Sequence, residues 1–384
     1  MKNLFYMFMT VSALLLAATS AVEGSSNPQS AGKQQTSKEV VNMVRKAAEK
    51  GNAAAQYDLG QYYLTGNGVT KNPAEALKWF RKAADQGDVD SMFCIGVCYS
   101  EGNGVKKDSA EAFKWFRNAA EKGDAAAQYN VGVYYMKGEG VNKKDPAEAL
   151  KWFRKAADQG DVSAQYNVAR CYYDGNGVKK DLAEAFKWFR KAAEQGYDEA
   201  QYRLGICYYE GAGVQKNMVG AFKWFSKAAE QGHMVSQYNV GVCYNTGNGV
   251  KQNPSEACKW FTKAAEQGDA NAMTSLGIYY EKKNPAEAVN WYRKAIEQGH
   301  VGALVNLGFC YKEGTGVKKD LSQAFKCFKE AADQGNATAM YNVGVCYEYG
   351  EGVKKDRKEA FIWYRKSAEG GDEYAIKALK GAGK

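Results

Sequence analysis

The sequence predicts an all-α solenoid built from tandem helical hairpins, and three observations support that fold class. A glycine recurs at intervals of about 36 residues, each repeat contains two stripes of apolar residues at helical spacing, and all eight tryptophans fall at one position of the repeat. Self-similarity at such a period is typical of stacked repeat proteins. The recurring glycines are Gly87, Gly123, Gly160, Gly196, Gly232, Gly268, Gly299, Gly335 and Gly371, which define nine repeats over residues 51–371.

The first half of each repeat is predicted to be a helix. In the first repeat, Ala55, Leu59, Tyr62 and Tyr63 lie on one helical face. A glycine inside this helix costs about 1 kcal/mol relative to alanine, so it needs a packing reason, and we expect close approach of a second backbone. This internal glycine is present at Gly60, Gly96, Gly132, Gly205, Gly241, Gly277, Gly308 and Gly344.

The second half of each repeat is predicted to be another helix, which begins after a glycine-rich turn. Asn72-Pro73-Ala74-Glu75 has the form of a capping box, with an acceptor side chain, a proline at the first helical position and a carboxylate three residues later. The same acceptor recurs at Asp108, Asp145, Asp181, Asn253, Asn284 and Asp356, and with a weaker cap at Asn217.

Stacking of the hairpins is required because one hairpin cannot bury its aromatic residues alone. The repeated tryptophans are Trp79, Trp115, Trp152, Trp188, Trp224, Trp260, Trp291 and Trp363. Cys327 replaces the tryptophan in the eighth repeat, which removes volume, so we expect a looser or repacked joint there.

The regions outside the nine repeats predict a secretory chain with half-repeats at both ends. Residues 1–21 have the basic start, apolar run and small-residue site of a cleaved signal peptide, too short to favour a membrane span. Residues 22–37 are predicted to be a flexible polar leader, 38–50 an N-terminal capping helix and 372–384 a C-terminal capping helix. We therefore expect a secreted or periplasmic protein without stable membrane insertion.

The repeated pattern LGxYYxxGxGVxKDxxEAxxWFxKAAxxG, present over residues 38–384, resembles the Sel-1-like repeat, a relative of the tetratricopeptide repeat. The resemblance implies a right-handed superhelix of α/α hairpins that assembles or recruits other proteins, often in secretory or envelope compartments. It also implies an alternative, because some cysteine-rich relatives have been linked to penicillin binding or β-lactamase activity. An enzyme would show turnover that disappears with one specific side chain.

Nine cysteines combined with a signal peptide raise the question of disulfides. Six cysteines share one position in successive hairpins, where a spacing of about 8–10 Å would prevent pairing. Cysteine-rich relatives bridge the two helices of one repeat, and the candidate pair here is Cys243 with Cys258. Cys310 with Cys327 is a poorer candidate, and buried free thiols are the expectation for the others.

One face of the first helices repeats aromatic and amide side chains, and in tetratricopeptide-like folds this face lines the concave groove. Asparagine can hydrogen-bond an extended peptide backbone, and tyrosine adds flat amphipathic area. Alternatively, the rings pack between hairpins and the asparagines tie helix to helix. The aromatic residues are Tyr57, Phe93, Tyr129, Tyr166, Tyr202, Tyr238 and Tyr341, and the amides are Asn130, Asn167, Asn239, Asn306 and Asn342.

The charge and the remaining motifs favour a non-enzymatic scaffold. Lys and Arg total 52 against 43 Asp and Glu, and the charges alternate along the helices, which indicates a solvated face rather than a nucleic-acid stripe. His233 and His300 stand at helix starts without metal-ligand spacing or a nearby nucleophile. We therefore expect a protein or extended peptide as partner, with no cofactor, metal, catalytic residue or nucleic acid.

Overall fold

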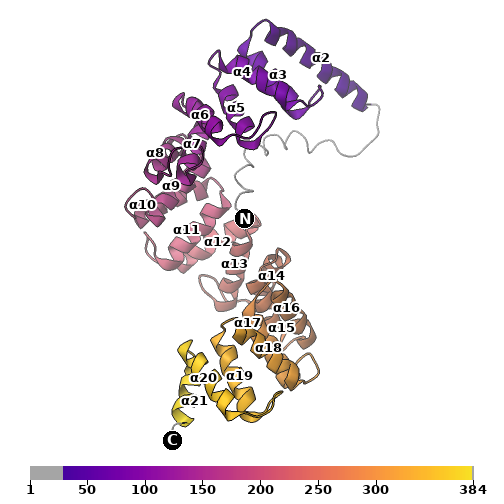
Figure 1. Ribbon diagram of the computed structural model, residues 1–384, viewed down its shortest axis with the longest axis vertical. Helices are drawn as coiled ribbons and strands as arrows, with labels where there is room; N and C mark the ends of the chain where they lie inside the picture. The colour runs from indigo at the N-terminus through magenta and orange to yellow at the C-terminus, as the bar shows by residue number, and fades with distance from the viewer. Residues whose placement is uncertain (1–28, 383–384) are drawn as a thin grey trace. The chain divides into compact units, whose positions relative to one another are not determined.

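The computed structural model describes residues 29–382, and it describes side chains over 38–379. Within residues 29–382 there are twenty helices and no strand, and consecutive helices pack in pairs, which confirms the all-α hairpin prediction (Figure 1). The predicted signal peptide, residues 1–21, lies outside the described part of the chain. The described helices form two compact units that meet between Asp161 and Val162 in the sequence.

The first unit contains an N-terminal helix and three hairpins, drawn from indigo to magenta in Figure 1. Its helices are α2 (Gln29–Glu49), α3 (Ala53–Thr65), α4 (Pro73–Ala84), α5 (Val89–Glu101), α6 (Ser109–Glu121), α7 (Ala125–Lys137) and α8 (Pro146–Asp158).

The second unit contains six hairpins and a final helix. Its first seven helices are α9 (Val162–Asp174), α10 (Leu182–Glu194), α11 (Asp198–Glu210), α12 (Met218–Glu230), α13 (Met234–Thr246), α14 (Pro254–Glu266) and α15 (Ala270–Tyr280). The remaining helices are α16 (Pro285–Glu297), α17 (Val301–Glu313), α18 (Leu321–Asp333), α19 (Ala337–Tyr349), α20 (Arg357–Glu369) and α21 (Glu373–Ala382).

The N-terminal helix is longer than the sequence predicts. We expected a flexible leader over 22–37 and a capping helix over 38–50, but α2 begins at Gln29, so the second half of that leader is helical. No proline interrupts the stretch, and its Gln, Lys and Ala residues have good helix propensity, which accounts for the extension. At the other end, α21 occupies most of the predicted C-terminal capping helix.

The internal glycines of the first helices make room for an aromatic ring, not for a second backbone as predicted. A Cβ atom added to Gly60 would lie 2.5 Å from Phe80 Cε1, and one added to Gly205 would lie 2.5 Å from Phe225 Cδ1. The phenylalanine belongs to the second helix of the same hairpin, and Phe80 is fully buried. Close backbone approach occurs instead at the connections, where a Cβ on Gly104 would lie 2.3 Å from the carbonyl carbon of Pro73 in the preceding hairpin.

The predicted helix caps are confirmed, although the capping box is not closed. The Asn72 side chain accepts the backbone N–H of Glu75 at 3.1 Å, and the other predicted caps accept in the same way, including Asn217 from Gly220 at 2.9 Å. Glu75 binds the Lys78 ammonium at 2.7 Å, one turn further along the helix. The glutamate thus supports the exposed face of the helix through an i,i+3 ion pair.

Glutamines form what we call the glutamine ladder between hairpins. In the sixth hairpin, Gln237 Nε2 donates to the carbonyl of Ala229 in the preceding second helix at 3.2 Å, and Gln237 Oε1 accepts from Gln267 Nε2 at 2.8 Å. Each rung therefore satisfies a buried amide and links two successive hairpins. The equivalent glutamine pairs are Gln56 with Gln86, Gln128 with Gln159, Gln165 with Gln195 and Gln201 with Gln231.

Candidate partner-binding surface

The predicted aromatic row, which we call the tyrosine face, has the same packing in seven hairpins. Each ring rests on the equivalent aromatic residue of its hairpin's second helix, with centroids 5.5–6.1 Å apart. Such contact fixes the ring while leaving part of it accessible. In the fourth hairpin Ala169 stands where the other hairpins have the internal glycine. Tyr166 is buried, and the others, Tyr57, Phe93, Tyr129, Tyr202, Tyr238 and Tyr341, are half-buried.

The asparagines beside these rings bond within their own helix rather than between helices. Asn130 Nδ2 donates to the carbonyl of Ala126 at 2.8 Å, and Asn167 Nδ2 donates to that of Ser163 at 2.9 Å. Asn342 repeats the contact with Thr338 at 2.8 Å and is buried. These bonds orient each amide one turn back along the helix. Asn239 is half-buried in the same position of the repeat.

A second row on this face was not identified from the sequence. It consists of the residue four positions after the tyrosine, which is apolar in seven of the nine repeats: Val97, Val133, Ile206, Val242, Ile278, Phe309 and Val345. Side chains four apart share a helix face, so this residue lies beside the tyrosine. Thr274 and Val305 replace the tyrosine in two repeats, and there Ile278 is 58% and Phe309 41% exposed.

The second unit also contains a polar cluster on this face that joins three hairpins through Glu199. Its Oε1 accepts from the Tyr166 hydroxyl at 3.2 Å and from Arg203 Nε at 3.1 Å, and its Oε2 lies 3.2 Å from His233 Nε2. His233 Nδ1 accepts the backbone N–H of Ser236, so the Nε2 proton is available to Glu199. Burial raises the pKa of Glu199, but His233 and Arg203 outweigh it and leave that pKa lowered.

Two arginines accompany this cluster, and with the rings of Tyr166 and Tyr202 they form what we call the arginine patch. The Arg170 guanidinium lies 5.9 Å from the centroid of the Tyr166 ring, and the Arg203 guanidinium lies 5.5 Å from that of Tyr202. Arg170 interrupts the apolar row, and Arg203 stands where most first helices carry asparagine. An arginine at a position that is apolar or asparagine in most other repeats is visible in the sequence, and this departure could have identified Arg170 and Arg203 as candidate binding residues.

The disulfide suggested between Cys243 and Cys258 is not formed, and all nine cysteines are free thiols in the structure. Cys243 packs with Phe225 and Ala229 of the preceding hairpin, whereas Cys258 packs toward the following hairpin, 3.8 Å from the Tyr280 hydroxyl. The two side chains therefore belong to different inter-hairpin contacts. The second candidate pair, Cys310 with Cys327, is free as well.

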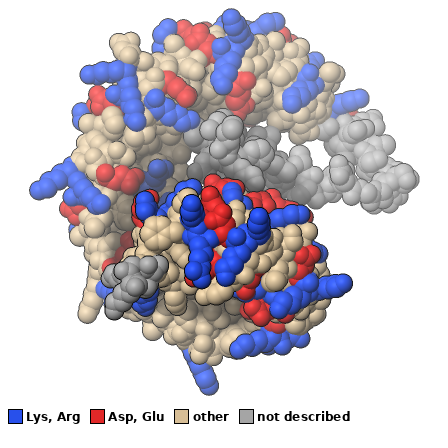
Figure 2. Space-filling model, turned by 60° about the horizontal axis from the view of Figure 1, so that its bottom comes forward, with Lys and Arg blue, Asp and Glu red and all other residues tan. Residues whose placement is uncertain are grey.

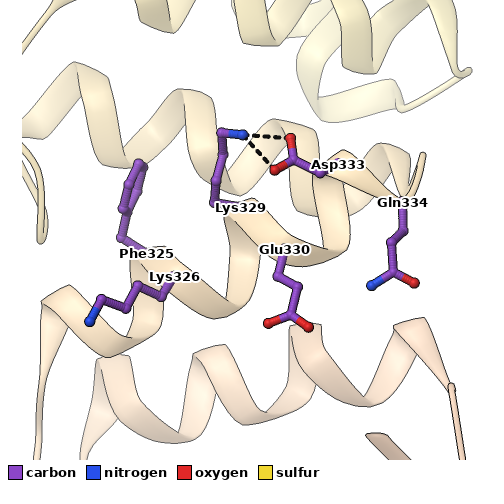
Figure 3. A pocket seen from close by; sticks show the side chains of 6 residues that line it. All are labelled: Phe325, Lys326, Lys329, Glu330, Asp333 and Gln334. Atoms are coloured by element: carbon purple, nitrogen blue, oxygen red, sulfur yellow. Dashed lines mark hydrogen bonds and ion pairs between the residues drawn. The ribbon is translucent and has the colours of Figure 1, made fainter.

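The exposed face of the second helices, which we call the outer face, repeats a stack of lysine on tryptophan in seven hairpins; the second hairpin has Asn118 at the lysine position, and the eighth lacks the tryptophan. The Lys82 ammonium lies 3.8 Å from the Trp79 ring centroid, and six other tryptophans have the same lysine three residues later. In α18 the equivalent residues are Cys327 and Glu330. An open depression of about 390 Å³ lies along that helix, where Lys329 pairs with Asp333 while Glu330 projects to the other side (Figure 3).

Charges of both signs alternate on the surface seen in Figure 2, with no continuous basic stripe on that face. Many of the pairs are local, such as Lys114 with Glu111 and Arg190 with Glu194. Over the described residues, no helix is long and apolar enough to cross a membrane, and no group of three or more His, Cys, Asp or Glu side chains is placed to hold a metal ion.

These features define the chain as a tandem α-hairpin repeat protein. A family model described as Sel1 repeat matches residues 53–88, 89–124, 125–161, 162–197, 198–233, 235–269, 270–300, 301–336 and 337–372. The chain belongs to the Sel1 repeat family, as the resemblance in its sequence predicted. No match was found among curated proteins.

Two solved structures are similar to the chain over most or all of their own length. A protective antigen of uropathogenic Escherichia coli, described as displaying an SLR fold, has 36% identity and a TM-score of 0.77; the alignment covers 88% of this chain and 81% of the antigen. A Sel1 repeat protein from Oxalobacter formigenes has 32% identity and a TM-score of 0.51, with 60% of this chain and 96% of that protein covered.

Proposed function

We propose that the protein is a non-enzymatic scaffold of a secretory or envelope compartment that binds a protein or extended peptide along the tyrosine face. Sel1 repeats typically form protein–protein interaction scaffolds, which supports the general role. The location on the tyrosine face is supported by one repeated observation: each aromatic ring of that face packs against a ring from the second helix of the same hairpin. A partner would meet aromatic surfaces that are already fixed, so little side-chain entropy is lost on binding.

The neighbouring rows suit an extended segment of a partner. Fixed tyrosines and exposed apolar residues such as Ile278 offer contact area, and asparagine amides at regular spacing offer hydrogen bonds to a peptide backbone. Asn239 is the amide best suited to a mutational test of partner binding. Its side chain is only half-buried, so replacing it with alanine removes little packing from the folded protein. No observation on the described residues favours the penicillin-binding or β-lactamase-like alternative.

Site-specific photocrosslinking tests this proposal. A benzophenone amino acid placed at Ile278 should capture a partner in the native compartment, whereas the same group at the exposed outer-face Lys259 should not. The double variant Tyr238→Ala/Asn239→Ala should lose the crosslink while circular dichroism shows that its helices are retained. Capture from Lys259 alone, or none from either position, would contradict binding on the tyrosine face.

The compartment requires a separate experiment because it depends on residues 1–21. Expression in the source cell followed by fractionation and N-terminal sequencing should give a mature chain that starts at Val22. A chain that retains Met1 and stays in the cytosol would reject this part of the proposal.

A further inference from the structure

We propose that the arginine patch binds a carboxylate-bearing side chain of the partner, and so selects an acidic segment of a protein for that part of the tyrosine face. This inference rests on the proposed function and specifies the chemistry of one stretch of the same surface. It depends on the contacts of Arg170 and Arg203 and on the aromatic residues around them.

Arg170 provides the accessible charge. Its side chain is exposed on α9, and no ion pair to a carboxylate is present for it among the described residues. The guanidinium instead lies over the Tyr166 ring, which leaves its outward N–H groups toward solvent. A guanidinium in this position can donate two parallel hydrogen bonds to one carboxylate.

Arg203 provides a second charge whose position is fixed. Glu199 accepts from its Nε, yet 43% of the Arg203 side chain remains exposed. His233 and Tyr166 bind the same carboxylate of Glu199, so Glu199 is held in place by three hairpins. The patch thus contains two guanidinium groups and one carboxylate, so it keeps a net positive charge.

The surrounding rings add contact area of the kind found at binding hot spots, which are enriched in tyrosine and arginine. Tyr173 and Tyr209 extend the patch along α9 and α11, and each ring has a lysine 5.6 Å from its centroid. Those lysines, Lys180 and Lys216, balance the exposed Asp174 and Glu210 at that end of the patch. The positive charge of the two arginines is therefore not cancelled there.

The preference is local to this stretch because the equivalent positions elsewhere differ. In the first hairpin, the position of Arg203 is occupied by Asp58 and that of Arg170 by Gln61. In the sixth hairpin the same positions are Asn239 and Val242. Among the nine repeats, only the fourth and fifth have an arginine at either of these two positions. We therefore expect the preference for acidic side chains at this stretch alone, on a surface that is otherwise neutral or acidic at these positions.

Fluorescence anisotropy with three labelled peptides tests the inference on the whole chain. The peptides share one length and one Tyr-Ala background and carry Glu, Gln or Lys at the variable positions. The Glu peptide should bind the wild type about tenfold more tightly than the Gln peptide, as expected for one charge-assisted pair. The difference should shrink as salt is raised, because the arginines are exposed.

Arg170→Gln is the main variant because the exposed Arg170 side chain has no ion pair among the described residues to lose. It should reduce the preference for the Glu peptide to about twofold or less, and Arg170→Gln/Arg203→Gln should abolish it. Arg190→Gln, on the outer face of α10, makes the same change in net charge and should leave the preference unchanged. An equal loss in Arg190→Gln would show that net charge alone is responsible and would overturn the proposal.

Two further outcomes would also overturn it. One is binding of the Gln or Lys peptide as tightly as the Glu peptide; the other is displacement of the Glu peptide by a short oligothymidylate that itself binds more tightly. If none of the three peptides binds while the benzophenone at Ile278 still captures a partner, the acidic preference is rejected and the scaffold function stands. Failure of both experiments would reject the proposed function as well.

Discussion

Gly205 lies directly beneath the ring of Phe225, so close that a Cβ atom on the glycine would be 2.5 Å from Cδ1 of the phenylalanine. The same relationship joins Gly60 to Phe80 and Gly241 to Phe261. The ring of the second helix thus occupies the space left by the missing glycine side chain, and the Tyr202 ring packs against the same Phe225 ring with centroids 6.1 Å apart.

Gly205→Ala should destabilise the protein by about 1–3 kcal/mol because the added methyl group meets a fully packed ring. Urea unfolding followed by circular dichroism measures the change. Gly205→Ala/Phe225→Leu provides the control, since the smaller side chain leaves room for the methyl group. The double variant should therefore lose less unfolding free energy than the two single variants lose together. Strictly additive losses would argue against the steric contact.

Nine thiols should react with Ellman's reagent in denaturant without prior reduction, because every cysteine is free in the structure. In the folded protein the reaction should be slow. Burial raises the pKa of the Cys171 and Cys243 thiols to about 11, which leaves little reactive thiolate at neutral pH. A count of seven would instead show that one disulfide is present, with Cys243 and Cys258 as the first pair to examine by mass spectrometry.

The free energy of unfolding should fall as the pH rises from about 9 to about 11. Burial raises the pKa of six thiols to about 11, so the folded state keeps protons that the unfolded state releases above about pH 9. The stabilisation is complete below the unfolded pKa and is lost as pH approaches the folded one.

Urea midpoints at several alkaline pH values check this dependence. Cys171→Ala/Cys243→Ala removes two of the buried thiols and should show a shallower decline than the wild type over the same range. An identical decline would assign the effect to other groups, such as the buried Tyr134 hydroxyl, whose pKa burial raises to about 12.

Gln237→Ala should lower the free energy of unfolding by about 1–3 kcal/mol because it removes two hydrogen bonds, one to the Ala229 carbonyl and one from the Gln267 amide. Gln237→Met should cost less, since the thioether fills the vacated volume, and methionine stands at this position in the seventh hairpin as Met273. Thermal or urea unfolding compares the two variants. If alanine were tolerated as well as methionine, the ladder would have no role in stability.

The repeats, the helix caps and the aromatic row could be predicted because each depends on residues close in sequence. The partner of the internal glycine could not, because choosing between a backbone and the Phe225 ring requires the crossing geometry of two helices. The arginine patch was missed for a related reason. Glu199 connects residues more than thirty positions away on either side, and periodicity within one repeat carries no information about such contacts.

The glutamine ladder gives the second unit two segments of different stiffness. Hydrogen bonds depend on angle as well as distance, so hairpins four to six, which are joined by the bonds of Gln201 to Ala193 and of Gln237 to Ala229, resist rotation against one another. Met273, Leu304 and Met340 occupy the ladder position in hairpins seven to nine, so these joints lack the buried amide bond and have apolar contacts in its place. Within the second unit, twisting under load should therefore be easier among the last three hairpins than among hairpins four to six.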